Sequence, residues 1–303
     1  SLVPLPARSA LRGPIAAVVS GIGLIVGGSM ASVSAAEQTL PGDLLFPIKI
    51  VSEQTRLALT TDKREKVRLK GEFVNRRVEE IKKIAQTDIE KRPERMKEAT
   101  EILRRDLDTV KNQLTDASEE TPSNRVEMAK LVDKTSAEVV AGLKLAKASL
   151  PADERPQMAD VEAAAVNNSV RAVNVILDSQ LHDEGAKKLV TKEELILSIN
   201  QKVEGVSAHI TVATQQLVDA GLISATATTA LAGSATSSVP LSVSMQKEFS
   251  SSAMTASTSS VTDLLNAHTS LAAARELLSQ NRLSEVGDKL IEASKSASSA
   301  ERT

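Results

Sequence analysis

The strongest constraint on this chain is the return of apolar residues every three or four positions over long stretches. Two unbroken series are Met96, Ala99, Leu103, Leu107, Val110 and Leu114, and then Leu195, Ile199, Val203, Val206, Ile210, Ala213 and Leu217. Residues with this spacing line one face of an α-helix and match the seams of coiled-coil-like helical bundles. The pattern therefore predicts an all-α protein.

The composition supports this fold class and excludes several others. The 303 residues include three Phe but no Tyr and no Trp, whereas β-sandwich and barrel cores draw on aromatic and β-branched side chains. The absence of cysteine excludes disulfides, thiolate nucleophiles and Cys-based metal sites. A formal net charge of −2 provides no global field for capturing nucleic acid, so no nucleic-acid partner is expected.

Helix-breaking sequences divide the body of the chain into helices of similar length. The breakers are Arg92-Pro93, Thr121 to Ser123, Leu150 to Pro156 and His182 to Gly185. The helices predicted between them span about 63–88, 93–118, 123–149, 155–181 and 191–220. Short connections favour antiparallel neighbours, so residues 37–222 are predicted to form an elongated antiparallel helical bundle or a chain of helical hairpins. No residues recur at a fixed period, and the sequence does not predict a solenoid.

The C-terminal part of the sequence predicts a linker and then a helical hairpin. Between Ser224 and Thr262, 19 of 39 residues are Ser or Thr, and this composition offers little apolar surface to bury. We therefore expect a Ser/Thr/Ala-rich linker over 223–262 and a helical hairpin over 263–303. The sequence leaves open whether that hairpin docks on the bundle.

An uncharged stretch from Gly13 to Ala36 predicts a transmembrane helix at 14–36. Its apolar part is long enough for the roughly 20 residues that cross a ~30 Å hydrocarbon core. Arg8 and Arg12 precede the stretch, so the positive-inside rule places residues 1–13 in the cytoplasm and the body outside it. The predicted protein is single-pass, with the membrane as its first partner.

The same stretch also fits a secretory signal peptide. The small residues Ser34, Ala35 and Ala36 form an acceptable cleavage region, although the apolar run exceeds the usual ~7–15 residues of a signal core. Both interpretations export the same body. Gly23 and Gly27 form a small-xxx-small pair, a spacing that allows two such helices to pack together and so provides for self-association.

A turn motif follows the membrane segment. Its residues are Leu40, Pro41, Gly42, Asp43, Phe46, Pro47 and Lys49. Leu40 to Asp43 is a turn sequence, and Pro47 suits the first turn of a helix that ends near Leu59. Asp62, with Glu65 three residues later, is typical of a capping box that opens the next helix. We expect a short helix, a tight corner and a long charged helix.

At these residues the chain resembles an uncharacterised extracytoplasmic domain family of bacteria, frequent in candidate-phyla lineages. In that family a membrane helix ending in small residues precedes a PGD-LYP-K-like signature and a helix rich in Arg and Glu. The matching residues are Ser34 to Ala36, Leu40 to Asp43, Phe46-Pro47, Lys49, Leu57 to Leu59, Phe73 and Arg76 to Glu80. Phe46 stands where Tyr is usual. The resemblance covers about residues 12–85, with 40–85 the family-like part of the exported domain, and implies a body outside the bacterial cytoplasmic membrane.

The sequence assigns no catalytic, cofactor-binding or metal-ligating residue, and no cofactor is expected. The three histidines, His182, His209 and His268, lack the spacing of helical metal-binding pairs. No Gly-rich phosphate loop and no GxSxG elbow is present. A basic cluster is compatible with lipid-headgroup contact, although its interspersed acids favour a solvated helix face; it comprises Lys63, Arg64, Lys66, Arg68 and Lys70.

These observations lead to two functional hypotheses. The first is a membrane-anchored extracytoplasmic helical protein, not an enzyme, that acts by non-catalytic interaction in the envelope or in signalling, with an unidentified protein or envelope partner. The alternative is a secreted or periplasmic helical binding or chaperone-like module that is released by signal cleavage. In the alternative, a groove between amphipathic helices would hold a partner helix.

Overall fold

The computed structural model describes residues 37–87, 91–151, 153–223 and 257–300, which fall in two compact units divided between Thr55 and Arg56. These residues form helices joined by turns, with no strand among them, which confirms the all-α prediction. The predicted transmembrane helix at 14–36 lies outside the described residues, as does most of the predicted linker at 223–262. Within the described ranges, no helix combines the length and the apolarity needed to cross a membrane.

The helices follow the predicted positions closely. They are α3 (Phe46–Leu59), α4 (Lys63–Gln86), α5 (Arg92–Asp116), α6 (Pro122–Ser149), α7 (Ala159–His182), α8 (Glu184–Lys187), α9 (Lys192–Asp219), α12 (Ser257–Ser279) and α13 (Leu283–Ala300). The prediction of one α-helix over 155–181 is wrong at its start, because Arg155–Met158 is a 3-10 turn. Pro156 lacks the N–H that a regular first turn would use, and α7 begins after it. At the other end of the chain, α12 begins before the predicted residue 263.

Polar side chains cap the starts of the long helices. Asp62 accepts a hydrogen bond from the backbone N–H of Glu65 at 2.7 Å, as the sequence predicts. The reciprocal capping box forms at α9, where Thr191 accepts from the N–H of Glu194 and the Glu194 carboxylate accepts from the N–H of Thr191. The backbone hydrogen bond from Thr191 lowers the pKa of the Glu194 carboxyl. These caps satisfy N–H groups that a helix start leaves unpaired.

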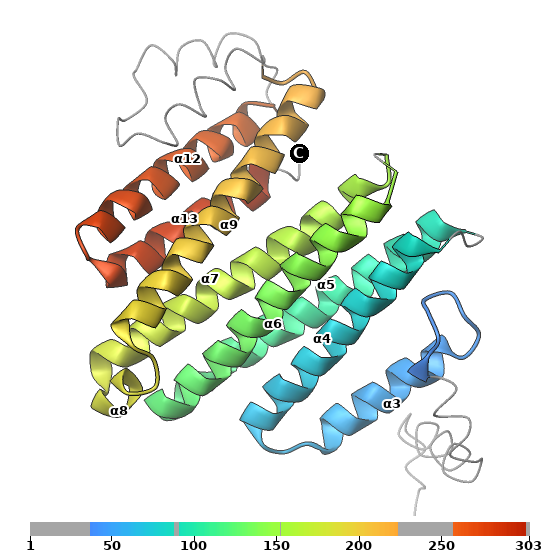
Figure 1. The fold of residues 1–303 in the computed structure, drawn as a ribbon, viewed down its shortest axis with the longest axis horizontal. Helices are drawn as coiled ribbons and strands as arrows, with labels where there is room; N and C mark the ends of the chain where they lie inside the picture. The colour runs from blue at the N-terminus through green and yellow to red at the C-terminus, as the bar shows by residue number, and fades with distance from the viewer. Residues whose placement is uncertain (1–36, 88–90, 152, 224–256, 301–303) are drawn as a thin grey trace, which may run out of the picture. The chain divides into compact units, whose positions relative to one another are not determined.

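The helices of the second unit form hairpins, and successive hairpins stack so that their corresponding helices, such as α4 and α6, lie side by side. Consecutive helices run antiparallel (Figure 1), whereas α4 and α6 run parallel. Their alignment follows from two contacts, Arg64 with Glu127 and Asn75 with Glu138, each joining residues 63 positions apart. Asn168 of α7 likewise donates to the Leu107 carbonyl of α5 at 2.8 Å. Helical-hairpin repeats stack in this way, although no repeat is visible in the residues themselves.

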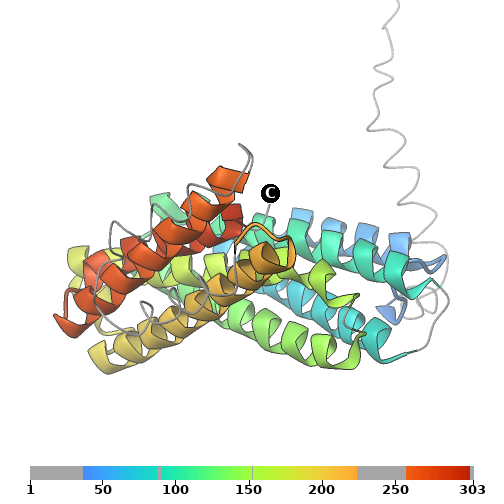
Figure 2. The same ribbon diagram turned by 90° about the horizontal axis from the view of Figure 1, so that it is seen from above.

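Helix α7 is shared by two groups of helices. It packs against α5 and α6 in the first group and against α9 and α13 in the second, where α12 packs on α9 and α13 (Figures 1 and 2). More than half of its 24 residues are buried, and most of these are Ala, Val or other small residues. Small side chains allow neighbouring helices to approach closely from more than one side. The core of the second unit is therefore continuous through α7.

The C-terminal hairpin docks on this shared helix. A Cβ atom at Gly287 of α13 would lie 2.3 Å from Oδ1 of Asn174 of α7, so the two backbones approach closely at that glycine. Asn174 donates to Asp288 at 3.3 Å, and Asn167 donates to Ser298 at 2.9 Å. These contacts answer the question that the sequence leaves open about the hairpin.

A second close approach, between α4 and α6, gives a test of the packing. A Cβ atom at Gly142 would lie 2.1 Å from Cγ1 of Val78, whereas a Cβ atom at Gly205 of α9 would meet no atom within 4 Å. We expect Gly142→Ala to lower the free energy of unfolding by about 1–3 kcal/mol through overpacking. Gly205→Ala should raise it by about 0.5–1 kcal/mol, because alanine has the higher helix propensity. Urea denaturation checks both values, and a stabilising Gly142→Ala would contradict the packing.

Candidate functional site

The turn motif in the first unit is held by hydrogen bonds between its own residues. The Asp43 carboxylate accepts from the backbone N–H of Leu40 at 2.8 Å, and the N–H of Asp43 donates to the Leu40 carbonyl at 3.0 Å. Gly42 has a φ of 87°, a left-handed conformation that favours glycine. Pro41, which follows Leu40, is buried. The backbone N–H of Phe46 donates to the Asp43 carbonyl. The motif therefore turns the chain directly into α3.

Lys49 ties the first turn of α3 back to the chain before the turn. Its ammonium Nζ donates to the Thr39 carbonyl at 3.1 Å and lies 5.8 Å from the centre of the Phe46 ring. Lys49 and Phe46 are both buried, whereas Pro47 is exposed in the first turn of the helix. The structure thus brings the seven predicted motif residues together as one local corner, and the geometry supports a structural role for them.

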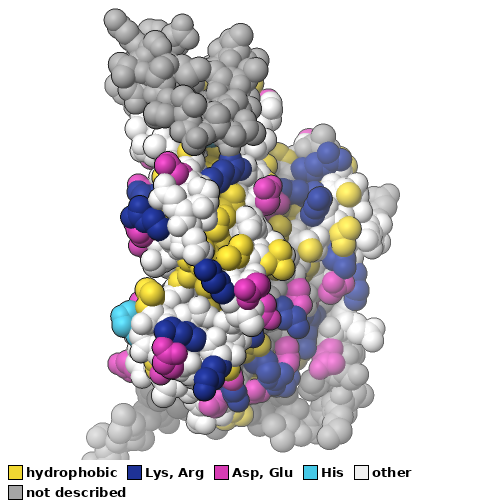
Figure 3. Space-filling view, turned by 60° about the vertical axis from the view of Figure 1, so that its left-hand side comes forward, with side chains coloured by type: hydrophobic (Ala, Val, Ile, Leu, Met, Phe, Trp, Pro, Cys, Tyr) yellow, Lys and Arg dark blue, Asp and Glu magenta, His cyan; other side chains and the backbone are white. Residues whose placement is uncertain are grey.

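The basic cluster at the start of α4 is largely neutralised by carboxylates. Four of its five members pair with carboxylates: Lys63 with Glu119 and Glu120, Arg64 with Glu127, Arg68 with Glu65 and Glu72, and Lys70 with Asp106. The hydrogen bond from Arg68 lowers the pKa of the Glu65 carboxyl. On the molecular face in Figure 3, basic and acidic side chains are interspersed on either side of a hydrophobic strip. This arrangement favours a solvated face of mixed charge over a phosphate site.

The three histidines lie on three different helices, α7, α9 and α12. His182 is exposed at the end of α7, where Nδ1 lies 2.8 Å from the Asp178 carbonyl. His209 and His268 are buried in α9 and α12. In the described ranges, no group of three or more His, Asp or Glu side chains is arranged to hold a metal ion.

A buried charge cluster between α4 and α5 was not predicted from the sequence. Arg77 has no exposed surface and donates to both carboxylate oxygens of Glu80 at 2.6 Å. Its Nε lies 3.9 Å from Asp106, which also pairs with Lys70. A signal was present, because Arg77 falls at the helical spacing of the apolar residues Val74 and Ile81. A charge on an apolar stripe needs a partner when it is buried.

A second polar cluster joins α6, α7 and α9. The Asp133 carboxylate of α6 pairs with Lys202 of α9 at 2.6 Å, and it accepts hydrogen bonds from Ser169 of α7 and Ser198 of α9. Lys202 is only 7% exposed. The cluster fixes three helices against one another near the N-terminal end of α9, and Asp133 is its only acid within the described contacts.

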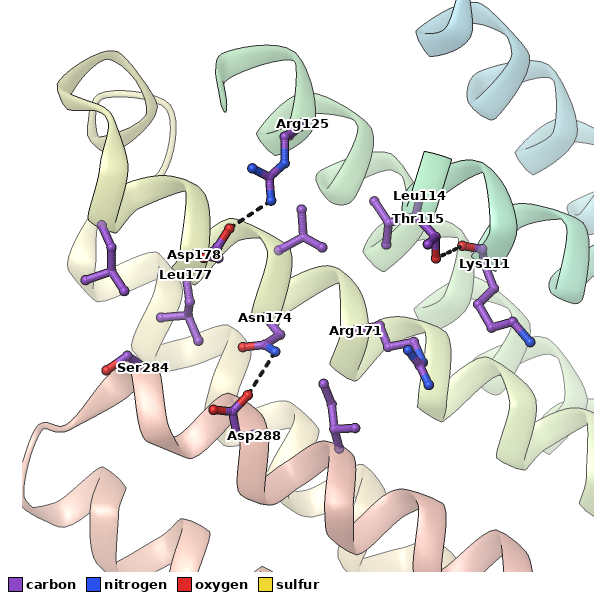
Figure 4. Close-up of a pocket in the computed structure, with 13 residues that line it drawn as sticks. Lys111, Leu114, Thr115, Arg125, Arg171, Asn174, Leu177, Asp178, Ser284 and Asp288 are labelled. Carbon is purple, nitrogen blue, oxygen red and sulfur yellow. Dashed lines mark hydrogen bonds and ion pairs between the residues drawn. The ribbon is translucent and has the colours of Figure 1, made fainter. Parts of the chain in front are cut away.

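The best candidate for a ligand site is a cavity of about 400 Å³ beside α7, between the two helix groups (Figure 4). One wall comes from α5 and α6 and the other from α13, while α7 supplies the floor. The lining residues are Lys111, Leu114, Thr115, Arg125, Arg171, Asn174, Val175, Leu177, Asp178, Leu181, Ser284, Asp288 and Ile291. Ligand pockets in helical bundles have this size and this mixture of apolar walls with a few polar groups.

The charges around the cavity differ in their pairing. Arg125 pairs with Asp178 at 2.8 Å, and Lys111 pairs with Asp108 at 3.0 Å. Arg171 is exposed and makes no hydrogen bond or ion pair with any residue that the structure describes. It is also the only charged residue between Glu162 and Asp178 in the sequence, a signal that sequence reasoning missed. The cavity can therefore offer one cation to a ligand.

Comparison with known proteins reaches only the first part of this structure. Residues 38–147 match a family model described as Domain of unknown function (DUF5667). No curated protein and no solved structure matches the chain. The match is consistent with the expected likeness to an uncharacterised family, and it runs beyond residue 85 through α5 to the last turn of α6. The walls of the cavity from α5 and α6 lie inside the matched stretch, whereas α7 and α13 lie beyond it.

Proposed function

We propose that this chain is a single-pass, membrane-anchored bacterial protein whose body lies outside the cytoplasm and acts through non-catalytic contacts in the envelope or in signalling. The observation that carries the proposal is the uncharged stretch from Gly13 to Ala36, with Arg8 and Arg12 before it. Its length and charge flank are those of a membrane helix with its N-terminus in the cytoplasm.

Two further observations support this proposal. The turn motif follows the uncharged stretch and resembles the PGD-LYP-K-like signature that stands outside the membrane in an uncharacterised bacterial family. The matched stretch 38–147 begins just after the uncharged stretch and includes the turn motif. In addition, many charges of the described helices pair with one another, and the face in Figure 3 mixes both signs. Such a surface suits contact with proteins or envelope components better than capture of a polyanion.

Topology labelling tests the proposal directly, because the chain has no native cysteine. We design two single-cysteine variants, Ser9→Cys before the uncharged stretch and Ser149→Cys at the exposed end of α6. With a membrane-impermeant maleimide on intact spheroplasts, Ser149→Cys should be labelled and Ser9→Cys should react only after lysis. The reversed pattern, or protection of both cysteines until lysis, would contradict an exported body.

The small residues Ser34 to Ala36 favour one alternative, the secreted or periplasmic binding module. Cell fractionation separates the two functions. An anchored protein stays with the membranes after an alkaline wash and keeps its first 36 residues. Release by osmotic shock, with residue 37 as the new N-terminus, would contradict membrane anchoring and support the secreted binding module.

A further inference from the structure

We propose that the cavity beside α7 binds a small amphiphilic anion, a compound that carries an acidic group on an apolar body. The proposal concerns residues 111–291 of the second unit and does not depend on membrane anchoring, so it stands or falls separately from the proposed function. It rests on three features of the cavity: its size, its apolar walls and its one cation without a partner.

The apolar walls of the cavity determine that the body of the ligand is apolar and small. Leu114 of α5 and Leu177 of α7 are each 5% exposed and close the cavity from the inside. Ile291 of α13 lies across from them, and Leu181 of α7 is 64% exposed at the rim. An apolar group that covers these side chains removes carbon surface from water, and a volume of about 400 Å³ limits the ligand to a small molecule.

The charges that line the cavity favour a ligand with an acidic group. The lining holds three cations, Lys111, Arg125 and Arg171, against the two carboxylates of Asp178 and Asp288. Asp178 is engaged by Arg125, and Asp288 accepts a hydrogen bond from Asn174. Figure 4 places Arg171 and Lys111 at the same end of the cavity, away from Ser284. A ligand anion at that end would meet an arginine that has no partner among the described residues, and arginine binds carboxylate, sulfonate or phosphate oxygens in pairs.

The polar groups nearby can orient such a head group. Thr115 is exposed one turn from Lys111, and its hydroxyl donates to the Lys111 carbonyl at 3.1 Å. Asn174 lies one turn from Arg171 on the same face of α7. The site exists only while α13 is docked on α7, because Ser284, Asp288 and Ile291 form one whole wall. Binding should therefore report on the docked hairpin as well.

The test uses the full chain in lipid nanodiscs and the fluorescent probe 8-anilinonaphthalene-1-sulfonate, which joins a sulfonate to an aromatic body. Signal from empty nanodiscs is subtracted. We expect saturable binding of one probe per chain, weakened about tenfold by Arg171→Gln through loss of a charged hydrogen bond. Thr115→Glu, which adds a negative charge beside Lys111, should also weaken binding. Circular dichroism and thermal melting confirm that both surface variants fold.

Arg105→Gln provides a matched control, because Arg105 is an exposed arginine of α5 outside the cavity. It should leave probe binding unchanged. The neutral analogue N-phenyl-1-naphthylamine, which lacks the sulfonate, should bind much more weakly than the anionic probe. Equal loss in Arg171→Gln and Arg105→Gln, or equal binding of the neutral and anionic probes, would overturn the proposal.

Competition with two carboxylates distinguishes between two possible sources of the ligand. Displacement of the probe by decanoate indicates a lipid-derived, single-chain acid, whereas displacement by 1-naphthoate alone indicates a soluble aromatic acid. Displacement by neither compound would contradict an amphiphilic-anion site. Inorganic phosphate alone should not compete, because it has no apolar body to cover Leu114 and Leu177.

Discussion

Replacing Glu80 with alanine is expected to lower the free energy of unfolding by about 3–5 kcal/mol, because it removes a carboxylate that a fully buried arginine engages through two hydrogen bonds. Arg77 has no exposed surface, and Glu80 is only 3% exposed. The guanidinium left behind would be a charge buried between α4 and α5 without the carboxylate that accepts its two hydrogen bonds. Breaking such a pair from one side costs far more than the pair contributes when it is intact.

A double-mutant cycle separates this effect from ordinary packing. The double variant Arg77→Met/Glu80→Met removes both charges and keeps much of the side-chain volume, so it should lose much less stability than the losses of the single variants Arg77→Met and Glu80→Met added together. Glu79→Ala is the control, because Glu79 lies next to Glu80 but is 60% exposed in its pair with Lys82. That change should cost less than about 1 kcal/mol. Equal losses for Glu79→Ala and Glu80→Ala, measured by urea denaturation, would contradict the buried cluster.

Lowering the pH is expected to destabilise the protein through His268 of α12. Burial lowers the pKa of this imidazole from 6.5 to about 4, and the nearby charge of Arg275 adds to the shift. Its ring nitrogens have no hydrogen-bond partner in the described structure, so the neutral form is the one that the fold accepts. The unfolded chain takes up a proton below its pKa of 6.5, whereas the folded chain does not until about pH 4. The contribution is therefore present above pH 6.5 and is lost as the pH falls towards 4.

The loss should reach about 3 kcal/mol over this pH range, since each unit of pKa shift corresponds to about 1.4 kcal/mol. His268→Leu and His268→Gln both remove the titrating ring, and both should flatten the decline of urea stability between pH 7 and pH 4. Their absolute stabilities will differ, because glutamine keeps a buried polar group. The difference in slope from the wild type is the measured quantity. A decline as steep in both variants as in the wild type would show that His268 is not the group responsible.

The sequence predicted the helices because their determinants are local. The apolar spacing of α5 and α9, the prolines at 93 and 122, and the cap at Asp62 all act within a few residues, and the structure places helix ends close to these signals. The central position of α7 could not be predicted in the same way. Its sequence resembles that of any amphipathic helix until one knows that neighbours approach it from both groups, and this information lies in residues far along the chain.

The candidate cavity shows the same limit. The turn motif could be identified from sequence, because Pro41, Gly42 and Asp43 carry turn chemistry within four residues. The cavity takes its walls from α5, α6, α7 and α13, and Asn174 meets Asp288 across 114 positions. No local pattern brings such residues together. Arg171 gave the one available signal, an isolated charge in a helix of small residues, but its spatial neighbours decide what that charge can bind.

The most direct test of the shared role of α7 is to cut the chain between α9 and α12 and to ask whether the pieces stay together. A protease site inserted after Ser237 of the full chain, with an affinity tag after Thr303, leaves α12 and α13 on the tagged piece. Because α13 packs on α7 and α9, the piece containing α3 to α9 should remain on the resin after cleavage. Gly287→Leu, which forces a side chain against Asn174, should release it. If cleavage of the chain without the Gly287→Leu change released that piece from the resin, the docked hairpin would be contradicted, and with it the cavity that the hairpin completes.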